Sequence, residues 1–505
     1  MDAVQQGLVG AWEIRDIKTK SVRGGAVTLA GQVLSILLQF GSTFLLARLL
    51  TPEDYGIQGM VYTLIAFLNI FKDAGLSVAS IQRQTLTHDQ ISTLYWLNIA
   101  TGAGLAGLLA ASAPLLADFY HEPRVVWVAV LSSLVFLLHG ASIQHRALLN
   151  RAMRFTAITG IDVGSAIFGV VVGILMAVGG YRYWSLVWMN ISGSIVSTAA
   201  YYVVMPWRPG RPVRGSGVGS MIRYGSTVTL NSVVVYFAYN TEKILLGRFW
   251  GAAPLGIYGR AYSLANLPVQ QFIASVGSVA FPLLSRVQSD AERLRRAFLR
   301  CHALVVSMII PALTVCAVFA EEIISVLLGP KWAGVAPVVR WLMPTVLAFA
   351  LINPLSWLLR SIGLVQRSLN IALMIAPVVI LGILAGLKYG PIGVAIGYSG
   401  AMVLLSAPMV AWAKHGTGIS TRDFLGAIKD PMIAGACGAV AAGIVKWTAQ
   451  ALLSPATILI AGAVISCGTY AMVLLFVLKQ KVFYADLVQE LVPKSRRFLS
   501  RAGGR

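Results

Sequence analysis

Charged residues and cysteines are scarce in this chain of 505 residues. Only 12% of the residues are charged, whereas 57% are hydrophobic. The four cysteines lie in apolar stretches without a C-x-x-C spacing, a pattern that indicates neither a zinc site nor a disulfide framework. So little charge and so much apolar surface do not fit a single soluble core, and we expect the chain in a lipid bilayer.

Sequence motifs of common catalytic and nucleotide-binding sites are also missing. The chain has no G-x-x-x-x-G-K-[ST] loop, no D-x-D and no H-E-x-x-H, and no glycine-rich nucleotide fingerprint follows a predicted strand. Without a P-loop, any energy input should come from an ion gradient or from consumption of the substrate. We therefore expect a protein that is not an enzyme and needs no cofactor, with coupling to H⁺ or Na⁺ left open.

Long apolar stretches dominate what is present. Stretches of about 20 apolar residues are long enough to span a membrane as helices. Fourteen spans are predicted: 24–47, 56–76, 91–117, 125–143, 157–179, 184–205, 224–246, 257–282, 301–320, 337–358, 370–388, 391–412, 431–453 and 456–478. An even number of spans puts both termini on the same side of the membrane.

The net charge of +21 could indicate a nucleic-acid partner, but its distribution argues against one. The predicted spans place most of the 40 lysines and arginines on one side and leave the other side neutral overall. This bias follows the positive-inside rule, so the basic side and both termini should be cytoplasmic. We expect a multi-pass membrane protein that has no nucleic-acid partner.

Two parts of the chain repeat one another. A gap-free shift of 200 places residues 223–264 on residues 23–64 with 11 identities, which include Arg48/Arg248 and Gly56/Gly256. The pattern predicts an all-α membrane protein with two pseudo-symmetric six-helix lobes plus two C-terminal helices. The expected organisation is a cytoplasmic segment at 1–23, an N-lobe at 24–205, a basic linker at 206–223, a C-lobe at 224–412, two helices within 431–478, and a basic tail at 479–505.

The first span carries polar residues that share one helix face: Gln32, Ser35, Gln39 and Ser42. Because polar groups are costly against lipid, this face should meet either other helices through hydrogen bonds or a water-filled cavity. The length of the stripe favours the cavity. The 200-residue shift places Tyr239 and Glu242 on the corresponding face of the seventh span.

Three charged residues within spans are candidates for function. Glu242 and Lys243 are about 100° apart around their helix, so they are not positioned as a side-by-side pair. We expect Glu242 to act as a protonatable or cation-binding switch and Lys243 to contact an anionic group; a structural salt bridge to the eighth or tenth span is the alternative. Asp162, in the fifth span, is either a second ion-coupling group or the structural partner of an arginine in a nearby inside loop.

Three further segments carry a family resemblance: LLARLLTPEDYGIQGM at 45–60, KDAGLSVASIQRQTLTHDQISTLYWLN at 72–98 and HRALLNRAMRF at 145–155. They resemble the polysaccharide-type (Wzx-like, colanic-acid-exporter-like) flippases of the multidrug, oligosaccharidyl-lipid and polysaccharide exporter superfamily. Beyond residue 155 the likeness is mainly one of helix number and two-lobe plan. The resemblance implies alternating access around a central cavity and an undecaprenyl-diphosphate-linked oligosaccharide as cargo.

Cationic and polar residues near the spans' outer ends would suit such a cargo. Arg48, Lys243 and Arg260 would offset the diphosphate charge. The eighth span adds polar residues at intervals of four positions: Tyr258, Tyr262, Asn266 and Gln270. The expected partners are a lipid-linked oligosaccharide, membrane lipids, and a polysaccharide polymerase with its assembly proteins.

Three other functions stay open at this point. One is a nontransporting scaffold for a polysaccharide assembly complex, which would tolerate neutralisation of the charges within the spans. An ion-coupled exporter of drugs or small metabolites could use the same architecture. A membrane enzyme such as a sugar polymerase would need a large outer loop with catalytic groups, and the predicted outer loops are short.

Overall fold

The computed structural model describes residues 14–72, 87–213, 236 and 240–484. These residues form helices joined by short turns, and no strand occurs among them. Ten of the described helical segments are long and apolar enough to cross a membrane. The protein is therefore an all-α polytopic membrane protein, as predicted. The number of fourteen spans stays a prediction, because most of 224–246 lies outside the described residues.

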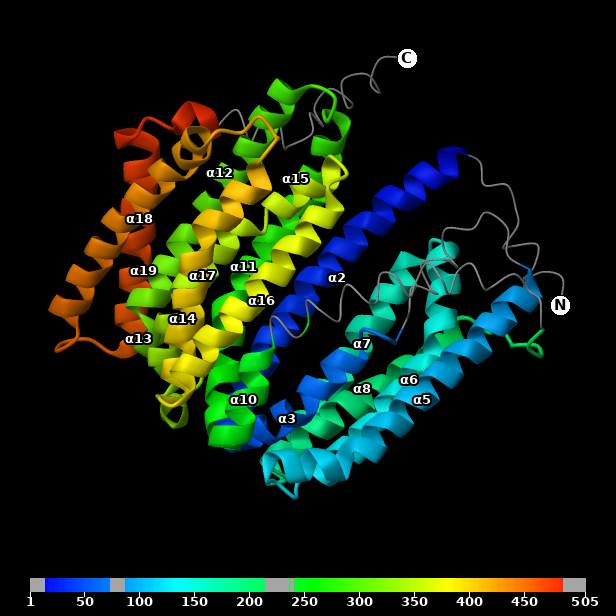
Figure 1. Cartoon of the computed structure of the whole chain (residues 1–505). Helices are drawn as coiled ribbons and strands as arrows, with labels where there is room; N and C mark the ends of the chain where they lie inside the picture. Colours follow the sequence, from blue (N-terminus) through cyan, green and yellow to red (C-terminus); the bar gives the residue numbers. More distant parts are fainter. Residues whose placement is uncertain (1–13, 73–86, 214–235, 237–239, 485–505) are drawn as a thin grey trace, which may run out of the picture. The chain divides into compact units, whose positions relative to one another are not determined.

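Contacts within the chain define two compact units, residues 1–256 and 257–505. The first unit contains α2 (Ile14–Leu49), α3 (Pro52–Leu68), α5 (His88–Tyr120), α6 (Val125–Arg151), α7 (Phe155–Val178), α8 (Trp184–Val204), α10 (Thr241–Trp250) and the first residues of α11 (Ala252–Arg286). Within it α5 packs along α6, α7 along α8, and α2 along α7 (Figure 1).

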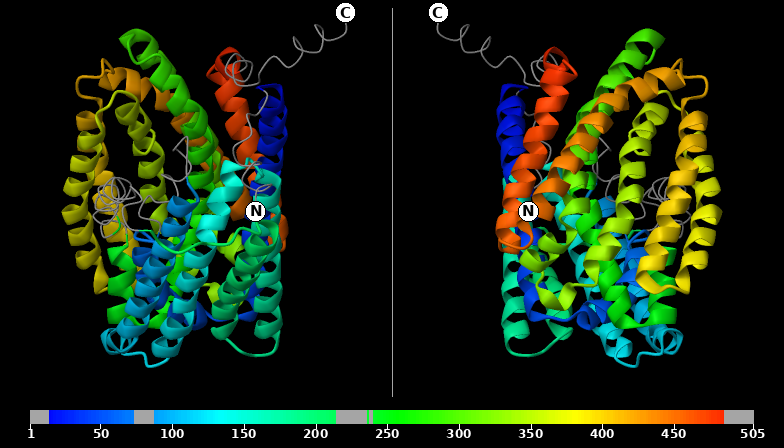
Figure 2. Two further views of the ribbon diagram at one scale, coloured as in Figure 1. Left: turned by 90° about the vertical axis from the view of Figure 1, so that its right-hand side faces the viewer. Right: turned by 90° about the vertical axis from the view of Figure 1, so that its left-hand side faces the viewer.

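The second unit contains the rest of α11 and the helices that follow it. These are α12 (Ala291–Val318), α13 (Ala320–Leu327), η1 (Pro330–Trp332), α14 (Val335–Ile352), α15 (Leu355–Ser361), α16 (Val365–Leu387), α17 (Gly390–Lys414), α18 (Thr421–Ala449), α19 (Pro455–Met472) and η2 (Val473–Val477). Within it α16 lies beside α17, and α18 packs against α12 and α19 (Figure 2).

Several helices begin before their predicted apolar spans, because polar residues cap their first turns. Thr87 caps α5 in a capping box with Gln90, and the helix begins at His88, three residues before the predicted start of that span. Ser420 and Asp423 form the same motif at α18, and Asp290 caps α12. The caps satisfy backbone N–H groups that would otherwise lack partners, so the helices continue beyond the apolar segment.

Ion pairs hold together one end of the first unit. Arg124, in the turn before α6, lies 2.6 Å from Glu53 near the start of α3. Arg182, in the turn before α8, lies 3.2 Å from Glu53 and 3.3 Å from Asp54. Asp54 also forms a capping box with Thr51 at the start of α3. These contacts tie α3 to the turns that precede α6 and α8.

Two glycines from the repeat allow a close backbone crossing within the first unit. A Cβ on Gly56 would lie 1.7 Å from the backbone oxygen of Ala252, and one on Gly256 would lie 1.9 Å from that of Pro52. The shift of 200 relates Gly56 to Gly256 and Pro52 to Ala252. The crossing is therefore reciprocal, as expected of a contact around a pseudo-two-fold axis.

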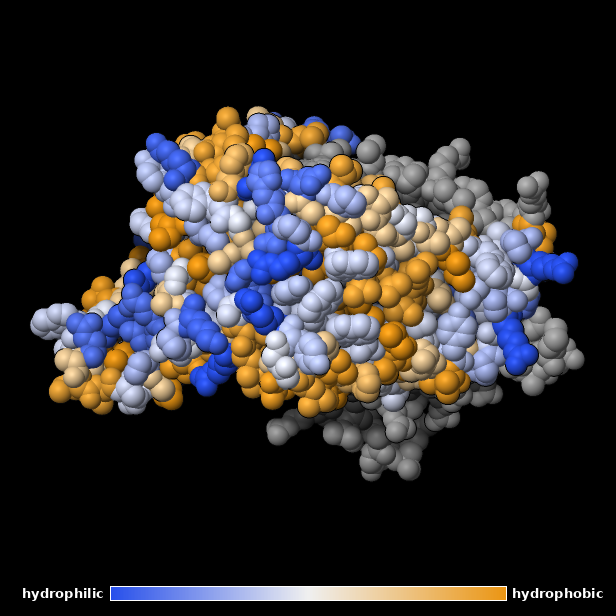
Figure 3. Space-filling view, turned by 90° about the horizontal axis from the view of Figure 1, so that it is seen from below, coloured by the Kyte–Doolittle hydropathy of each residue, from blue (hydrophilic) through white to orange (hydrophobic). Residues whose placement is uncertain are grey.

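Large apolar side chains are exposed on both units, including Leu175 and Val203 in the first and Leu404 and Val440 in the second. Figure 3 shows one face of the molecule, on which apolar side chains surround clusters of hydrophilic ones. Exposed apolar surface of this extent is expected of helices that contact lipid.

Candidate functional site

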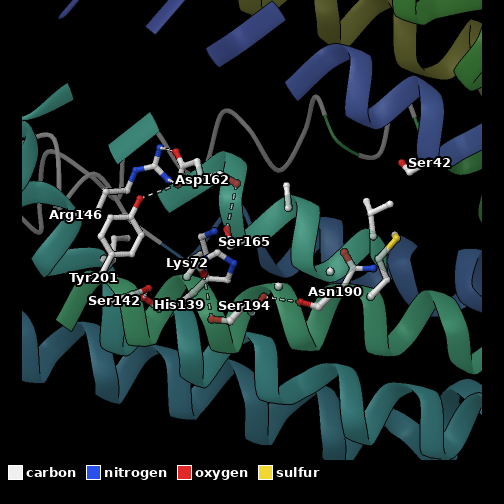
Figure 4. A pocket seen from close by; sticks show the side chains of 17 residues that line it. Ser42, Lys72, His139, Ser142, Arg146, Asp162, Ser165, Asn190, Ser194 and Tyr201 are labelled. Atoms are coloured by element: carbon white, nitrogen blue, oxygen red, sulfur yellow. Dashed lines mark hydrogen bonds and ion pairs between the residues drawn. The ribbon is translucent and has the colours of Figure 1, made fainter. Parts of the chain in front are cut away.

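The first unit encloses a polar cavity of about 550 Å³. Its walls come mainly from α6, α7 and α8; Lys72 lies beside His139 and Ser165, and Ser42 of α2 lies apart from the other side chains (Figure 4). The polar and charged residues that line it are Ser42, Lys72, His139, Ser142, Arg146, Asp162, Ser165, Asn190, Ser194, Ser197 and Tyr201. A polar cavity between apolar helices is the kind of place in which a membrane protein can hold a hydrophilic group.

An ion pair lies at one end of the polar wall. The guanidinium of Arg146 on α6 donates to both carboxylate oxygens of Asp162 on α7, at 2.8 and 3.3 Å. The Tyr201 hydroxyl on α8 also donates to Asp162, at 2.8 Å (Figure 4). The side chains of Arg146 and Asp162 are 52% and 36% exposed, so the pair is open to the cavity. A ligand anion could compete with Asp162 for the guanidinium.

The small polar side chains present acceptor oxygens to the cavity. The hydroxyls of Ser142, Ser165, Ser194 and Ser197 each donate to a backbone carbonyl three or four residues earlier. The Asn190 amide donates to Leu186 in the same way. Because each hydroxyl hydrogen is used within its own helix, its oxygen lone pairs remain as acceptors. Such a wall suits hydroxyl groups that donate hydrogen bonds.

A second cavity of about 370 Å³ adjoins the first. The two share Lys72, His139, Asn190 and Ser194 in their linings. The second is lined partly by α3, through Gln58, Tyr62 and Asn69. Together they form a continuous polar region inside the first unit, with cationic side chains from Lys72 and Arg146.

The predicted residues of the first unit divide between this region and the surface. Asp162 lies in the cavity, and its partner Arg146 is on α6 rather than in a loop, because that helix continues to Arg151. Gln32, Gln39 and Arg48 are exposed on α2 and do not line either cavity. Exposure of the two glutamines fits a face that meets water. The role predicted for each of these residues remains a prediction.

Glu242 is fully buried in the first turn of α10, which packs against α3 and α5. Neither of its carboxylate oxygens has a hydrogen-bond partner among the described residues. Lys243 donates from Nζ to the Asn240 side chain at 2.8 Å. Tyr239 lies outside the described residues. The switch predicted at Glu242 therefore stays a prediction.

The predicted residues of the second unit lie along α11. Tyr262 stacks on Tyr258, with ring centroids 6.3 Å apart, and Arg260 is half-buried nearby. Asn266 is buried, and its amide atoms have no hydrogen-bond partner among the described residues. Gln270 lines a hollow of about 340 Å³ with Trp357 and Arg360. These residues are not gathered in one described cavity.

Several cavity residues did not emerge as candidates from the sequence. Lys72, Arg146 and His139 stood near predicted span ends, where charge is unremarkable. A signal was present in α8, because Asn190, Ser194, Ser197 and Tyr201 follow one another at spacings of four, three and four and so share a helix face. Among the described residues, no group of His, Cys, Asp and Glu side chains could hold a metal ion.

Comparisons with known proteins agree with this architecture. The chain is 26% identical over 392 residues to the lipopolysaccharide biosynthesis protein WzxC of Escherichia coli K12, covering 76% of this chain and 78% of that protein. It is 28% identical over 342 residues to the teichuronic acid biosynthesis protein TuaB of Bacillus subtilis 168, covering 66% and 70%.

Among solved structures, the lipid II flippase MurJ in an inward closed conformation has the same fold. The match has a TM-score of 0.71 at 14% identity and covers 92% of this chain and all of that one. The family model for polysaccharide biosynthesis proteins matches residues 45–337, more than half of the chain. The family expected from residues 45–155 is thereby confirmed: the chain belongs to the polysaccharide biosynthesis protein family.

Proposed function

We propose that this protein is a flippase that carries lipid-linked oligosaccharides across the membrane by alternating access. The observation that carries the proposal is the polar cavity among apolar helices, whose walls combine the cations Lys72 and Arg146 with acceptor oxygens from serines and Asn190. The cations suit a diphosphate, and the acceptors suit sugar hydroxyls. The names of the relatives, which refer to lipopolysaccharide and teichuronic acid biosynthesis, support the same cargo class.

The cavity addresses the physical difficulty of moving such a cargo. Each polar group without a hydrogen-bond partner costs several kcal/mol in hydrocarbon. A cavity that replaces water around the diphosphate and the sugars removes most of that cost, while the polyprenyl tail stays in lipid. The relatives act on different polysaccharides by name, so the wall needs to recognise shared chemistry rather than one sugar.

Asp162 gives the cavity a way to bind and release an anion. In the empty cavity its carboxylate compensates the charge of Arg146, which would be costly if left alone inside the membrane. A cargo phosphate would take over the guanidinium, and Asp162 would then gain a proton or a cation. This exchange would couple cargo binding to H⁺ or Na⁺. Glu242 is a second candidate for the same coupling, because its carboxylate is fully buried in the first unit.

The remaining parts of the proposal concern the cell. The protein is a multi-pass membrane protein. We place it in the bacterial cytoplasmic membrane, with both termini cytoplasmic, where the basic linker at 206–223 and tail at 479–505 would stay. It would act without catalysis, between the enzymes that build the lipid-linked unit and a polymerase on the outer side.

Deletion of the gene in its host tests the proposal. We expect lipid-linked repeat units to remain on the cytoplasmic leaflet and export of a surface polysaccharide to stop, with both restored by the wild-type gene. Normal polymer together with altered drug tolerance would contradict the proposal and favour an exporter of small molecules.

A further inference from the structure

The second unit has a cavity of a different kind, between α11 and α12. It is a groove of about 1180 Å³, larger than either cavity of the first unit. Most of its lining is apolar: Val276, Val279, Ala280, Pro282, Leu283, Val287, Ala297, Leu304 and Met308. Apart from arginines, its polar lining is limited to Ser275, Ser278 and Cys301. It therefore lacks the wall of acceptor oxygens that would bind a sugar.

Four arginines lie at one end of the groove. Arg286 ends α11, and Arg293, Arg296 and Arg300 follow one another at spacings of three and four on one face of α12. From Arg293 to Arg300 the row extends about 10 Å along the helix. The groove thus combines a cationic end with an apolar floor, which matches the two parts of an anionic lipid.

Acidic residues near this end compensate only part of its charge. Asp290 lies 3.0 Å from Arg293, and Glu292 lies 3.4 Å from Arg296. Glu292 also pairs with Arg295, which in turn contacts Asp423 of α18 and does not line the groove. The side chains of Arg293 and Arg296 remain 72% and 63% exposed, so both can contact a further anion.

The start of α5 in the first unit offers a comparison, because the protein's own linker covers it. Trp96 donates from Nε1 to the Gly210 carbonyl at 2.8 Å, and Thr93 accepts the Val213 N–H at 3.1 Å. The start of α12 in the second unit instead carries arginines beside an apolar groove.

The charge and the apolar floor identify the occupant. We propose that the α11–α12 groove binds an anionic glycerophospholipid, with its phosphate on Arg286, Arg293, Arg296 and Arg300 and an acyl chain along Leu283, Leu304 and Met308. The positive-inside bias assigns this end to the cytoplasmic leaflet. The lipid would be a resident of the fold. This inference does not depend on the identity of the transported cargo.

The test uses the purified full-length protein in nanodiscs of phosphatidylethanolamine with and without phosphatidylglycerol. Native mass spectrometry after release into detergent counts the phosphatidylglycerol molecules that stay bound. We expect wild-type protein to retain phosphatidylglycerol in preference to phosphatidylethanolamine. The double variant Arg293→Gln/Arg296→Gln should bind it about 30-fold more weakly, because two cations near the phosphate are lost.

Two further variants distinguish binding in the groove from general attraction of the lipid to positive charge. Arg208→Gln/Arg211→Gln removes the same charge from two exposed positions of the first unit and should leave retention unchanged. Ala297→Trp fills the groove between the arginines without changing the charge, and it should also abolish retention.

Two outcomes would overturn the inference. The first is an equal loss of bound phosphatidylglycerol in the groove variant and the surface variant, which would indicate attraction to net charge alone. The second is displacement of phosphatidylglycerol by undecaprenyl phosphate at comparable concentration, which would assign the groove to the carrier lipid instead.

Discussion

The start of α5 in the first unit and the start of α12 in the second have opposite chemistry. In α5, Thr93 and Trp96 hydrogen-bond to the chain that follows α8. In α12, Arg293 and Arg296 face a large apolar groove. The start of one helix is thus a contact with protein, and the start of the other is a cationic surface.

This comparison of the two units indicates which features both repeat copies have kept. The reciprocal crossing has a glycine in both copies, Gly56 and Gly256, although the residues opposite them, Ala252 and Pro52, differ, and the polar surfaces have diverged. The described polar cavity is formed by α6, α7 and α8 of the first unit, and the described arginine groove by α11 and α12 of the second. We infer that the backbone frame is shared and that the ligand chemistry belongs to each unit separately.

The largest loss of stability is expected at the glycines of the crossing, which both repeat copies share. Gly56→Ala and Gly256→Ala each place a methyl group within 2 Å of a backbone oxygen, so the crossing segments must separate. We expect destabilisation of about 3 kcal/mol or more, seen as a lower melting temperature in detergent and poor accumulation in the membrane.

Gly59→Ala and Gly259→Ala are the matched controls for the crossing. A Cβ at Gly59 would make only ordinary contact, at 3.5 Å from Leu255, and one at Gly259 would meet nothing within 4 Å. Both should keep wild-type stability within about 0.5 kcal/mol. Equal destabilisation at all four positions would contradict the claim that the crossing is especially sensitive to an added methyl group.

The next effect tests the polar cavity. Arg146→Ala should weaken cargo binding about 30-fold, because a charged hydrogen-bonding group is lost while Asp162 remains without its guanidinium partner. Arg146→Lys should bind cargo with an affinity between those of wild type and Arg146→Ala, since lysine keeps the charge but not the bidentate geometry. Arg151→Ala, on the same helix but outside the cavity lining, serves as the control.

Asp162→Asn distinguishes competition from structural support. If Asp162 competes with cargo for Arg146, the variant should bind cargo more tightly and transport it more slowly. A purely structural carboxylate would instead lower melting temperature and binding together. Binding is measured on purified protein, and transport as restoration of surface polymer in the deletion strain.

The third prediction concerns polymer export by variants of Glu242 and Lys243. Glu242→Gln should stop polymer export while the protein inserts and accumulates normally, because the amide keeps the shape of a fully buried side chain but cannot ionise. Lys243→Arg should be tolerated better than Lys243→Ala, since it retains the positive charge. Wild-type export by both Glu242→Gln and Lys243→Ala would show that this pair is not a site.

The smallest effect concerns the linker contact of the first copy. Trp96→Phe removes the hydrogen bond to Gly210 and should cost about 1 kcal/mol of stability, with export unchanged. Trp127→Phe, at an exposed position of α6, should cost less. Loss of export by Trp96→Phe at normal protein levels would mean that the linker contact itself takes part in transport.

The sequence predicted the membrane helices well, because hydropathy reports burial in lipid directly. The span predicted at 184–205 corresponds to α8, Trp184–Val204, and that at 157–179 to α7, Phe155–Val178. Helix starts were less predictable where a cap precedes the apolar segment, as at Thr87 and Ser420. Hydropathy does not register the hydrogen bonds of a cap.

The cavity was only partly predictable. Asp162 stood out because a carboxylate is costly in a membrane helix, but its partner Arg146 looked like a loop residue at the end of an apolar stretch. The serines gave no clear signal, since each can bond to its own helix carbonyl wherever it faces. Which helix faces meet is decided by tertiary packing, and one sequence does not reveal it.

The central claim is tested most directly by measuring flipping in proteoliposomes. Purified protein is reconstituted with labelled undecaprenyl-diphosphate-linked oligosaccharide, and a membrane-impermeant glycosidase added outside reports the accessible fraction over time. We predict that wild-type protein brings inner-leaflet cargo to the outside much faster than protein-free vesicles, and that Arg146→Ala does not. A wild-type rate no faster than that of empty vesicles, or an Arg146→Ala rate equal to wild type, would contradict the account.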